Sequence, residues 1–251
     1  YDRTDPTGKI VKGLPTKEAL IEKLRQAPGN GPIVGWGFDP NFLDGPRLSK
    51  LELNEVSTQR PVIVVHSNFH LATVNTLALD KSGITASLNI EGIVKGPDGQ
   101  PNGELQEFAA MEPALSVGGI TIGELSTEPS AVRNYATMAR NVGVTTIADL
   151  LSDLDPPEVE MLQKVTSDEN FPVRYVPIMN AMRGDPALEA KRATELKPQS
   201  TDKLRLGTAK LFTDGAIQGF TAKLNEPGYY NGPDNGIYNM EDTHFRKAVF
   251  E

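Results

Sequence analysis

Apolar and polar residues follow two different spacings along the chain, and these spacings predict where its helices and strands lie. Residues 17–26 carry apolar side chains three and four positions apart, which predicts an amphipathic helix. Two short apolar runs, 31–39 and 60–66, predict strands, and the β-branched residues of the second run favour burial on both of its faces. The turn residues Asp98-Gly99 predict a hairpin over 92–103.

Other segments are interpreted from weaker patterns. Residues 72–82 resemble a helix that ends at a glycine, and the glycine-rich stretch 111–124 resembles a mobile loop over a pocket. Near the C-terminus, 225–239 has the glycines, prolines and tyrosines of a loop, and a helix is expected to begin at Met240.

In the second half of the chain, predicted helices and buried strands alternate. The first helix of this part starts at Thr127 with the Glu128-Pro129 pair and ends at Gly143. The elements that follow are a strand at 144–149, a helix at 157–165, a strand at 171–179, a helix at 185–196 and a third strand that holds Lys210. This alternation is typical of a parallel sheet with right-handed crossovers.

Composition narrows the classes of protein and the kinds of site. The 251 residues, 38% of them hydrophobic, suffice for one large domain or two smaller ones. A net charge of −8, with scattered lysine and arginine, argues against a nucleic-acid partner or an anionic membrane, and no apolar run is long enough to cross a bilayer. Cysteine is absent, so imidazole ligands for a metal must come from His66, His70 or His244.

Lys210 has the most informative position in the sequence. It lies in the apolar run 204–215, which we interpret as a buried strand that ends in a tight turn at Asp214-Gly215. A buried ammonium needs compensation, either from a carboxylate such as Asp214 or by reaction with carbon dioxide to give a carbamate that can bridge two metal ions. A lysine that reaches solvent from the end of a strand is the alternative.

Four further side chains are candidates for a site, and each also has an ordinary structural interpretation. Trp36 stands between glycines and either packs in the core or lies beside a ligand. His66 and His70 have a spacing that suits a metal on a helix, but a strand leads into them, which favours hydrogen-bonded structural roles. Glu107 taken alone is typical of a solvent-exposed carboxylate.

Several of these stretches together resemble signatures of the amidohydrolase superfamily, and in particular amidohydrolase family 3, the N-substituted formamide deformylase-like enzymes. The resemblance extends with gaps from Trp36 to Tyr230. It is carried by the segments 60–62, His70 with 75–79, 101–107, 143–147, 209–213 and 214–227. The chain departs from the family pattern at Phe69, Thr76, Ala216 and Phe220.

The resemblance implies a (β/α)8 TIM barrel that holds one or two divalent metal ions, with zinc as the expected metal. Lys210 would be the carbamate ligand of the metal, and Asp214 would order the loop beside it. His70, Trp36 and Glu107 would shape the pocket for the substrate. The implied reaction is hydrolysis of a C–N bond in a small-molecule amide by a metal-activated water.

The family's His-x-His pair does not occur in the sequence, and its further ligands have no match here. The resemblance therefore implies an internal portion of a longer protein: an incomplete barrel without the terminal β-sandwich, whose remaining ligands lie outside this chain. Residues 1–125 would hold an α+β insertion and an early barrel strand, and 126–251 the βα units. We expect a cytoplasmic protein, with a periplasmic or secreted location and a homodimer left open.

Two other classes of function remain at this point. A regulatory or scaffold barrel without catalysis would account for the missing ligands. A phosphate-binding barrel is disfavoured because no glycine-rich strand-to-helix loop occurs in the sequence.

Overall fold

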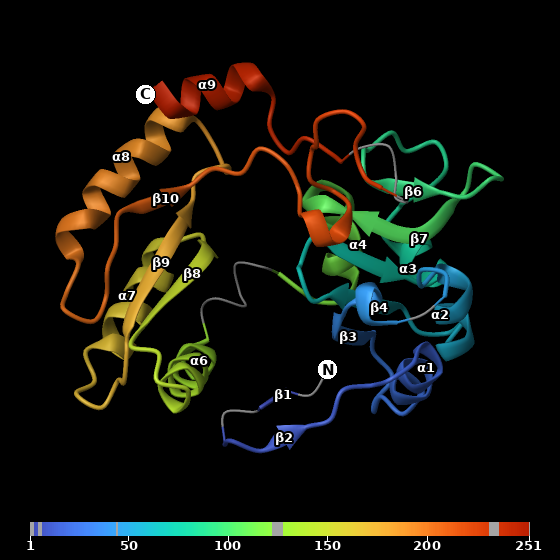
Figure 1. The fold of residues 1–251 in the computed structure, drawn as a ribbon, viewed down its shortest axis with the longest axis horizontal. Coiled ribbons are helices and arrows are strands. Elements are labelled where there is room, and N and C mark those ends of the chain that lie inside the picture. The colour runs from blue at the N-terminus through green and yellow to red at the C-terminus, as the bar shows by residue number, and fades with distance from the viewer. Residues whose placement is uncertain (1–2, 5–6, 44, 122–127, 231–235, 251) are drawn as a thin grey trace. The chain divides into compact units, whose positions relative to one another are not determined.

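The computed structural model describes residues 3–4, 7–43, 45–121, 128–230 and 236–250 (Figure 1). The chain forms two compact units. The first unit comprises Gly13–Thr121 and Asp214–Asn239, and the second comprises Asp2–Lys12, Ile122–Thr213 and Met240–Glu251. The segment Asp214–Asn239, which the sequence analysis grouped with the βα units, thus packs with the first unit instead.

The first unit is built on a five-stranded mixed sheet. Its strands, in spatial order, are β3 (Ile33–Phe38), β4 (Val62–His66), β5 (Leu71–Val74), β7 (Pro101–Gln106) and β6 (Ile93–Lys95). Strands β3 and β4 are parallel, and the other neighbours are antiparallel. Its helices are α1 (Lys17–Arg25), α2 (Lys50–Val56), α3 (Thr76–Lys81) and α4 (Glu107–Val117), with short 3-10 turns η1 (Pro40–Phe42) and η3 (Ile217–Gly219).

Helices cover both faces of this sheet, because β4 directs apolar side chains to both of its faces. All five residues of β4 are buried, as the sequence predicted. Val62 and Val64 belong to the same core as side chains of α1 and α2, whereas Ile63 and Val65 pack with α3 and α4. The strand therefore alternates between two cores, as the two-residue period of a strand requires.

Two interpretations of the first unit were wrong in part. The helix expected at 72–82 begins only at Thr76, because Leu71–Val74 forms the buried strand β5. Four residues are too few for periodicity to separate a buried strand from a helix. The stretch expected to be a loop from Met111 is the helix α4 up to Val117, and residues 122–124 lie outside the described residues.

The second unit is built on a three-stranded parallel sheet of order β10-β9-β8, which confirms the predicted alternation. Its strands are β8 (Thr146–Ser152), β9 (Arg174–Asn180) and β10 (Thr208–Lys210). Its helices are α6 (Pro129–Asn141), α7 (Pro156–Thr166), α8 (Pro186–Leu196) and α9 (Asp242–Phe250), with the 3-10 turn η2 (Lys197–Gln199) and the ribbon β1 (Arg3–Thr4) and β2 (Ile10–Val11). Thr127, expected at the start of α6, lies outside the described residues.

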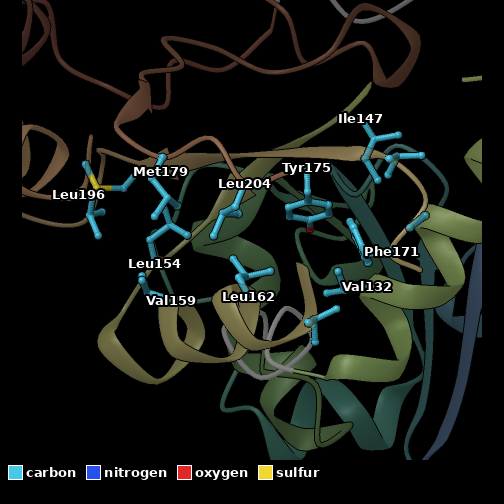
Figure 2. Close-up of a cluster of buried hydrophobic side chains, with 14 of the residues drawn as sticks. Val132, Ile147, Leu154, Val159, Leu162, Phe171, Tyr175, Met179, Leu196 and Leu204 are labelled. Atoms are coloured by element: carbon cyan, nitrogen blue, oxygen red, sulfur yellow. The ribbon is translucent and has the colours of Figure 1, made fainter. Parts of the chain in front are cut away.

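One core holds α6, α7 and α8 of the second unit against its sheet (Figure 2). Ile147, Tyr175 and Met179 contribute from the sheet, and Leu162 and Leu196 meet them from α7 and α8. Each Å² of apolar surface that is removed from water stabilises the fold by about 25 cal/mol. This core is therefore the main source of stability of the unit.

The α/β class is confirmed, but the barrel is not. Within the described ranges the strands form sheets of five, three and two members, and none of these sheets closes on itself. Among those same residues, no helix combines the length and the apolar composition that a membrane crossing needs.

Candidate functional site

Lys210 lies at the carboxyl edge of the parallel sheet in the second unit, where α/β proteins hold ligands. Its neighbour in the register is Asn180, the last residue of β9. The strand expected to be long and buried has three residues, and Lys210 is half-buried. Its ammonium lies 5.3 Å from the centroid of the Phe212 ring. Partial exposure and this cation–π contact stabilise the charge, so burial alone does not demand a carbamate.

Two other polar side chains end the neighbouring strands at this edge. Asn180 Oδ1 accepts a hydrogen bond from the Met182 backbone amide at 3.1 Å, which fixes the turn after β9. Ser152, at the end of β8, is 1% exposed, and its Oγ has no hydrogen-bond partner among the described residues. No local pattern marks Ser152, because its environment depends on how three strands that are distant in sequence assemble.

A second group of polar side chains lies in the first unit, where β5 begins and β7 ends. Leu71 and Gln106 are paired across these strands, so His70 and Glu107 become neighbours. His70 Nδ1 lies 2.9 Å from Glu107 Oε2. The Glu107 backbone amide also donates to the His70 carbonyl at 2.8 Å. Two residues that are 37 positions apart are thus joined by both backbone and side chain.

The Glu107 carboxylate is buried and remains ionised. The residue is 4% exposed, whereas the His70 side chain is 32% exposed. Asn239 Nδ2 donates to Glu107 Oε2 at 2.9 Å, and Thr221 lies beside the other oxygen. Burial acts to raise the pKa of Glu107, but the hydrogen bonds from His70 and Asn239, together with the nearby Thr221 hydroxyl, outweigh it and hold that pKa below its usual value.

The backbone around this pair is strained. Phe69, Glu107 and Phe220 have φ angles of 61°, 62° and 62°, and they are three of the four non-glycine residues with positive φ in the part of the chain that the structure describes. One precedes His70, one is Glu107 itself and one precedes Thr221. Such conformations cost about 1 kcal/mol or more each and tend to occur where a functional site requires them.

Asp214 orders the loop that carries Thr221. Its Oδ2 accepts a hydrogen bond from the Lys223 backbone amide at 2.7 Å, and its backbone bridges to Tyr238. The Gly215 amide donates to the Thr221 carbonyl at 3.2 Å. These contacts fold the loop back on itself and bring Thr221 to Glu107.

Gly215 is pressed against the same carboxylate, which leads to a prediction. A Cβ at this position would approach Thr221 Oγ1 and Glu107 Oε1 more closely than real Cβ atoms do. We expect Gly215→Ala to lower the free energy of unfolding of the first unit by about 1–3 kcal/mol through overpacking. Urea unfolding followed by the fluorescence of Trp36, the single tryptophan, measures the change.

Gly31 provides the matched control for that prediction. It is exposed, and a Cβ there would meet nothing within 4 Å. We expect Gly31→Ala to change the stability by no more than about 0.5 kcal/mol. Equal unfolding midpoints for the two variants would contradict the close packing of Gly215.

Trp36 is exposed, whereas His66 is buried. Trp36 is 60% exposed on the edge strand β3, so its interpretation as a core residue is wrong. His66 is 2% exposed, and its Nε2 lies 3.0 Å from Thr73 Oγ1, which confirms its structural role. Desolvation by burial, and secondarily the charge of Arg47, lowers the pKa of His66 to about 3.

A small pocket with a volume of about 100 Å³ opens in the first unit, lined in part by Lys17, Arg47 and Phe220. Both of its cations are already engaged by the protein. Arg47 Nε lies 2.8 Å from the buried carboxylate of Glu104, and Lys17 Nζ donates to the Pro46 carbonyl at 2.7 Å. Glu104 thus offsets the charge of Arg47 in this pocket, although Nη2 of Arg47 has no hydrogen-bond partner among the described residues.

The described residues do not by themselves form a metal site. Among them, no group of three or more histidine, aspartate or glutamate side chains is arranged to hold a metal ion. His70 faces Glu107 through Nδ1 alone, His66 is buried against Thr73, and His244 is exposed on α9 in the second unit. Lys210 can supply at most one ligand.

Asn239 and Thr221 were not recognised as partners of Glu107 from the sequence. Thr221 lies within a segment that carries the family resemblance, but its partner could not be inferred from that segment. Asn239 is 132 positions from Glu107, and no local pattern marks it.

The parallel strands of the second unit thus end in polar side chains at the edge where α/β proteins generally bind ligands. The sequence model of the amidohydrolase family matches residues 3–251. The chain therefore belongs to the amidohydrolase family, as the sequence analysis expected.

Two proteins of similar sequence are much longer than this chain. The YtcJ protein of Bacillus subtilis (strain 168), which is named as an amidohydrolase, is 26% identical over 95% of this chain and 46% of its own length. The LONG AFTER FAR-RED 3 protein of Arabidopsis thaliana is 27% identical over 92% of this chain and 41% of its own length. The chain thus spans less than half of either relative.

A solved structure has a similar fold. It is an uncharacterized metal-dependent hydrolase from Pyrococcus horikoshii OT3, which matches with a TM-score of 0.53 and 20% identity over 95% of this chain and 46% of its own.

Proposed function

We propose that the chain is part of a metal-dependent hydrolase that cleaves a C–N bond in a small-molecule amide. The observation that carries the proposal is the family match over residues 3–251. The position of Lys210 at the carboxyl edge of a parallel sheet agrees with it. A formamide-type substrate is the finer form of the proposal and rests on the motif resemblance alone.

In this proposal Lys210 supplies one metal ligand as a carbamate, and the further ligands lie outside this chain. A divalent ion such as zinc would polarise the amide carbonyl and lower the pKa of a bound water. Within the first unit taken by itself, the partly exposed imidazole of His70 offers a hydrogen-bonding group, and the buried Glu107 orients it.

The second candidate is a scaffold or regulatory protein without a metal. It is favoured by one observation, that the described residues contain no group of three ligands. The two candidates differ in a quantity that can be measured directly, which is the metal content.

Metal content tests the proposal in the complete protein that contains this chain, purified from cells supplied with zinc, manganese or iron. We expect about one to two ions per chain by mass spectrometry, and none in Lys210→Ala. Lys191→Ala is the control, because Lys191 lies on the surface of α8 with its side chain 71% exposed. A protein free of metal under every growth condition would support the scaffold instead.

A further inference from the structure

In the hydrogen bond between His70 and Glu107, only His70 can be the donor. An ionised carboxylate accepts hydrogen bonds and cannot donate them. Because Glu107 is held ionised, the 2.9 Å contact between Nδ1 and Oε2 requires a hydrogen on Nδ1 of His70. A neutral imidazole with its hydrogen on Nδ1 has a lone pair on Nε2.

The Nε2 atom of His70 is available to a ligand. It makes no hydrogen bond within the described part of the chain, and it is not among the buried side-chain atoms that lack a partner. The His70 side chain is also 32% exposed. The imidazole therefore turns one nitrogen to a buried carboxylate and the other to solvent.

Glu107 cannot compete with His70 for the same ligand. It is 4% exposed: His70 and Asn239 engage Oε2, and Oε1 is buried away from solvent without a hydrogen-bond partner among the described residues. Its contribution is to fix the tautomer and the plane of the ring, as a buried carboxylate does for a histidine whose other nitrogen binds a partner.

The backbone also holds the imidazole in place before any ligand arrives. Asn68 Oδ1 accepts a hydrogen bond from the His70 amide at 2.9 Å, and the His70 carbonyl accepts one from the Glu107 amide at 2.8 Å. The positive φ of Phe69 completes this turn. A side chain fixed in this way loses little entropy on binding, which favours affinity.

We infer that His70 is a selective hydrogen-bond acceptor: its Nε2 binds ligands that carry an N–H or O–H donor, and Glu107 is the residue that positions it. The inference rests on the proposed function for the ligand class, since in an amide hydrolase the donor is the N–H of a primary or secondary amide. Tertiary amides and esters lack this hydrogen and would be rejected. A site that is built to pair one polar group discriminates strongly against analogues without it.

The tautomer can be read without any ligand and without activity. Long-range 1H–15N spectra of the 251-residue chain near pH 8 distinguish the protonated nitrogen of each of the three histidines. We expect the hydrogen of His70 on Nδ1. In Glu107→Gln we expect the preference to be lost, whereas Glu112→Gln, which changes an exposed carboxylate of α4, leaves it intact. A hydrogen on Nε2 of His70 in the wild-type chain would overturn the inference.

Two small probes then test selectivity. Acetamide carries N–H groups and N,N-dimethylacetamide does not, although the two have the same carbonyl. We expect acetamide to shift the Nε2 signal of His70, with an affinity about tenfold lower in Glu107→Gln, and the dimethyl compound to leave the signal unchanged. Equal shifts from both probes would overturn donor selection.

The outcomes separate this inference from the proposed hydrolase. If Lys210→Ala leaves the metal content unchanged while His70 still selects acetamide, the hydrolase proposal fails and the acceptor site stands. If metal is lost in Lys210→Ala but both probes act equally on His70, the acceptor site fails and the hydrolase stands.

Discussion

Acidification from about pH 7.5 to about pH 5 is expected to lower the free energy of unfolding of the first unit by about 2 kcal/mol through His66 alone. The cause is the burial of this imidazole between Thr73 and Phe38. The residue is 2% exposed, and the centroid of its ring lies 4.9 Å from that of Phe38. No carboxylate pairs with it in the described residues, and its Nδ1 has no hydrogen-bond partner among them.

The sign of the effect follows from the direction of the pKa shift. Desolvation by burial, followed by the charge of Arg47, lowers the pKa of His66 from 6.5 to about 3. As pH falls through 6.5, the unfolded chain binds a proton that the folded chain does not accept until about pH 3. The stability contributed by a neutral His66 is therefore complete above pH 6.5 and declines by about 1.4 kcal/mol per pH unit below it.

Glu107 does not contribute to this pH dependence, because its effect on stability changes only at a lower pH. Its folded-state pKa is lowered from 4.5, so its contribution to stability is present above pH 4.5 and is lost as pH falls through the lowered value. An experiment that stops at pH 5 reports on His66 and not on Glu107.

Urea unfolding at a series of pH values, followed by Trp36 fluorescence, measures the slope in the first unit. We expect His66→Gln to flatten the slope, because glutamine can reach Thr73 but does not titrate. His244→Gln, which removes an exposed histidine of α9, should leave it unchanged. Should the variant fail to fold, NMR titration of the wild-type histidine decides: a His66 that titrates near pH 6.5 in the folded chain contradicts the prediction.

The elements that were predicted correctly are those whose pattern is local. Helices α1 and α8 have amphipathic spacing, and both begin with a capping residue, Thr16 or Asp185. The hairpin of β6 and β7 follows from its turn residues. These elements could be predicted from the sequence because their own residues determine their structure.

The errors concern properties that depend on distant residues. The apolar run that leads to Lys210 buries Leu204 and Leu206, but Thr208 and Ala209 are exposed, so the environment of the lysine could not be inferred from the run. His70 and Glu107 were both expected near a pocket, yet their pairing depends on the register of β5 against β7. Sequence identified these candidate side chains, and tertiary structure decided what each one contacts.

Asn75→Ala is expected to lower the free energy of unfolding of the first unit by about 3–5 kcal/mol, because one buried amide satisfies four backbone groups. Its Oδ1 accepts from the backbone amides of Val62 and Ala78 at 3.0 and 2.9 Å. Its Nδ2 donates to the carbonyls of Ser57 and Arg60 at 2.7 and 3.0 Å. The residue is completely buried, so water cannot replace these bonds.

The magnitude follows from what alanine leaves behind. Each buried backbone group that loses its partner costs about 1–3 kcal/mol, and loss of the N-cap of α3 costs about 1 kcal/mol. These terms are not additive, since the loop before β4 can relax toward solvent once its carbonyls are released. The segments 60–62 and 75–79, which carry part of the family resemblance, thus meet at a structural clamp rather than at a site.

Asn54→Ala is the matched control, because its amide bonds the start of the same helix from a half-exposed position. It exchanges two hydrogen bonds with Thr76, at 2.9 and 3.0 Å, that water can replace. We expect a loss of no more than about 1 kcal/mol in urea unfolding followed by Trp36 fluorescence. If Asn75→Ala does not fold, hydrogen exchange in the wild-type chain provides the test: rapid exchange of the Val62 and Ala78 amides, or equal losses in the two variants, would contradict the clamp.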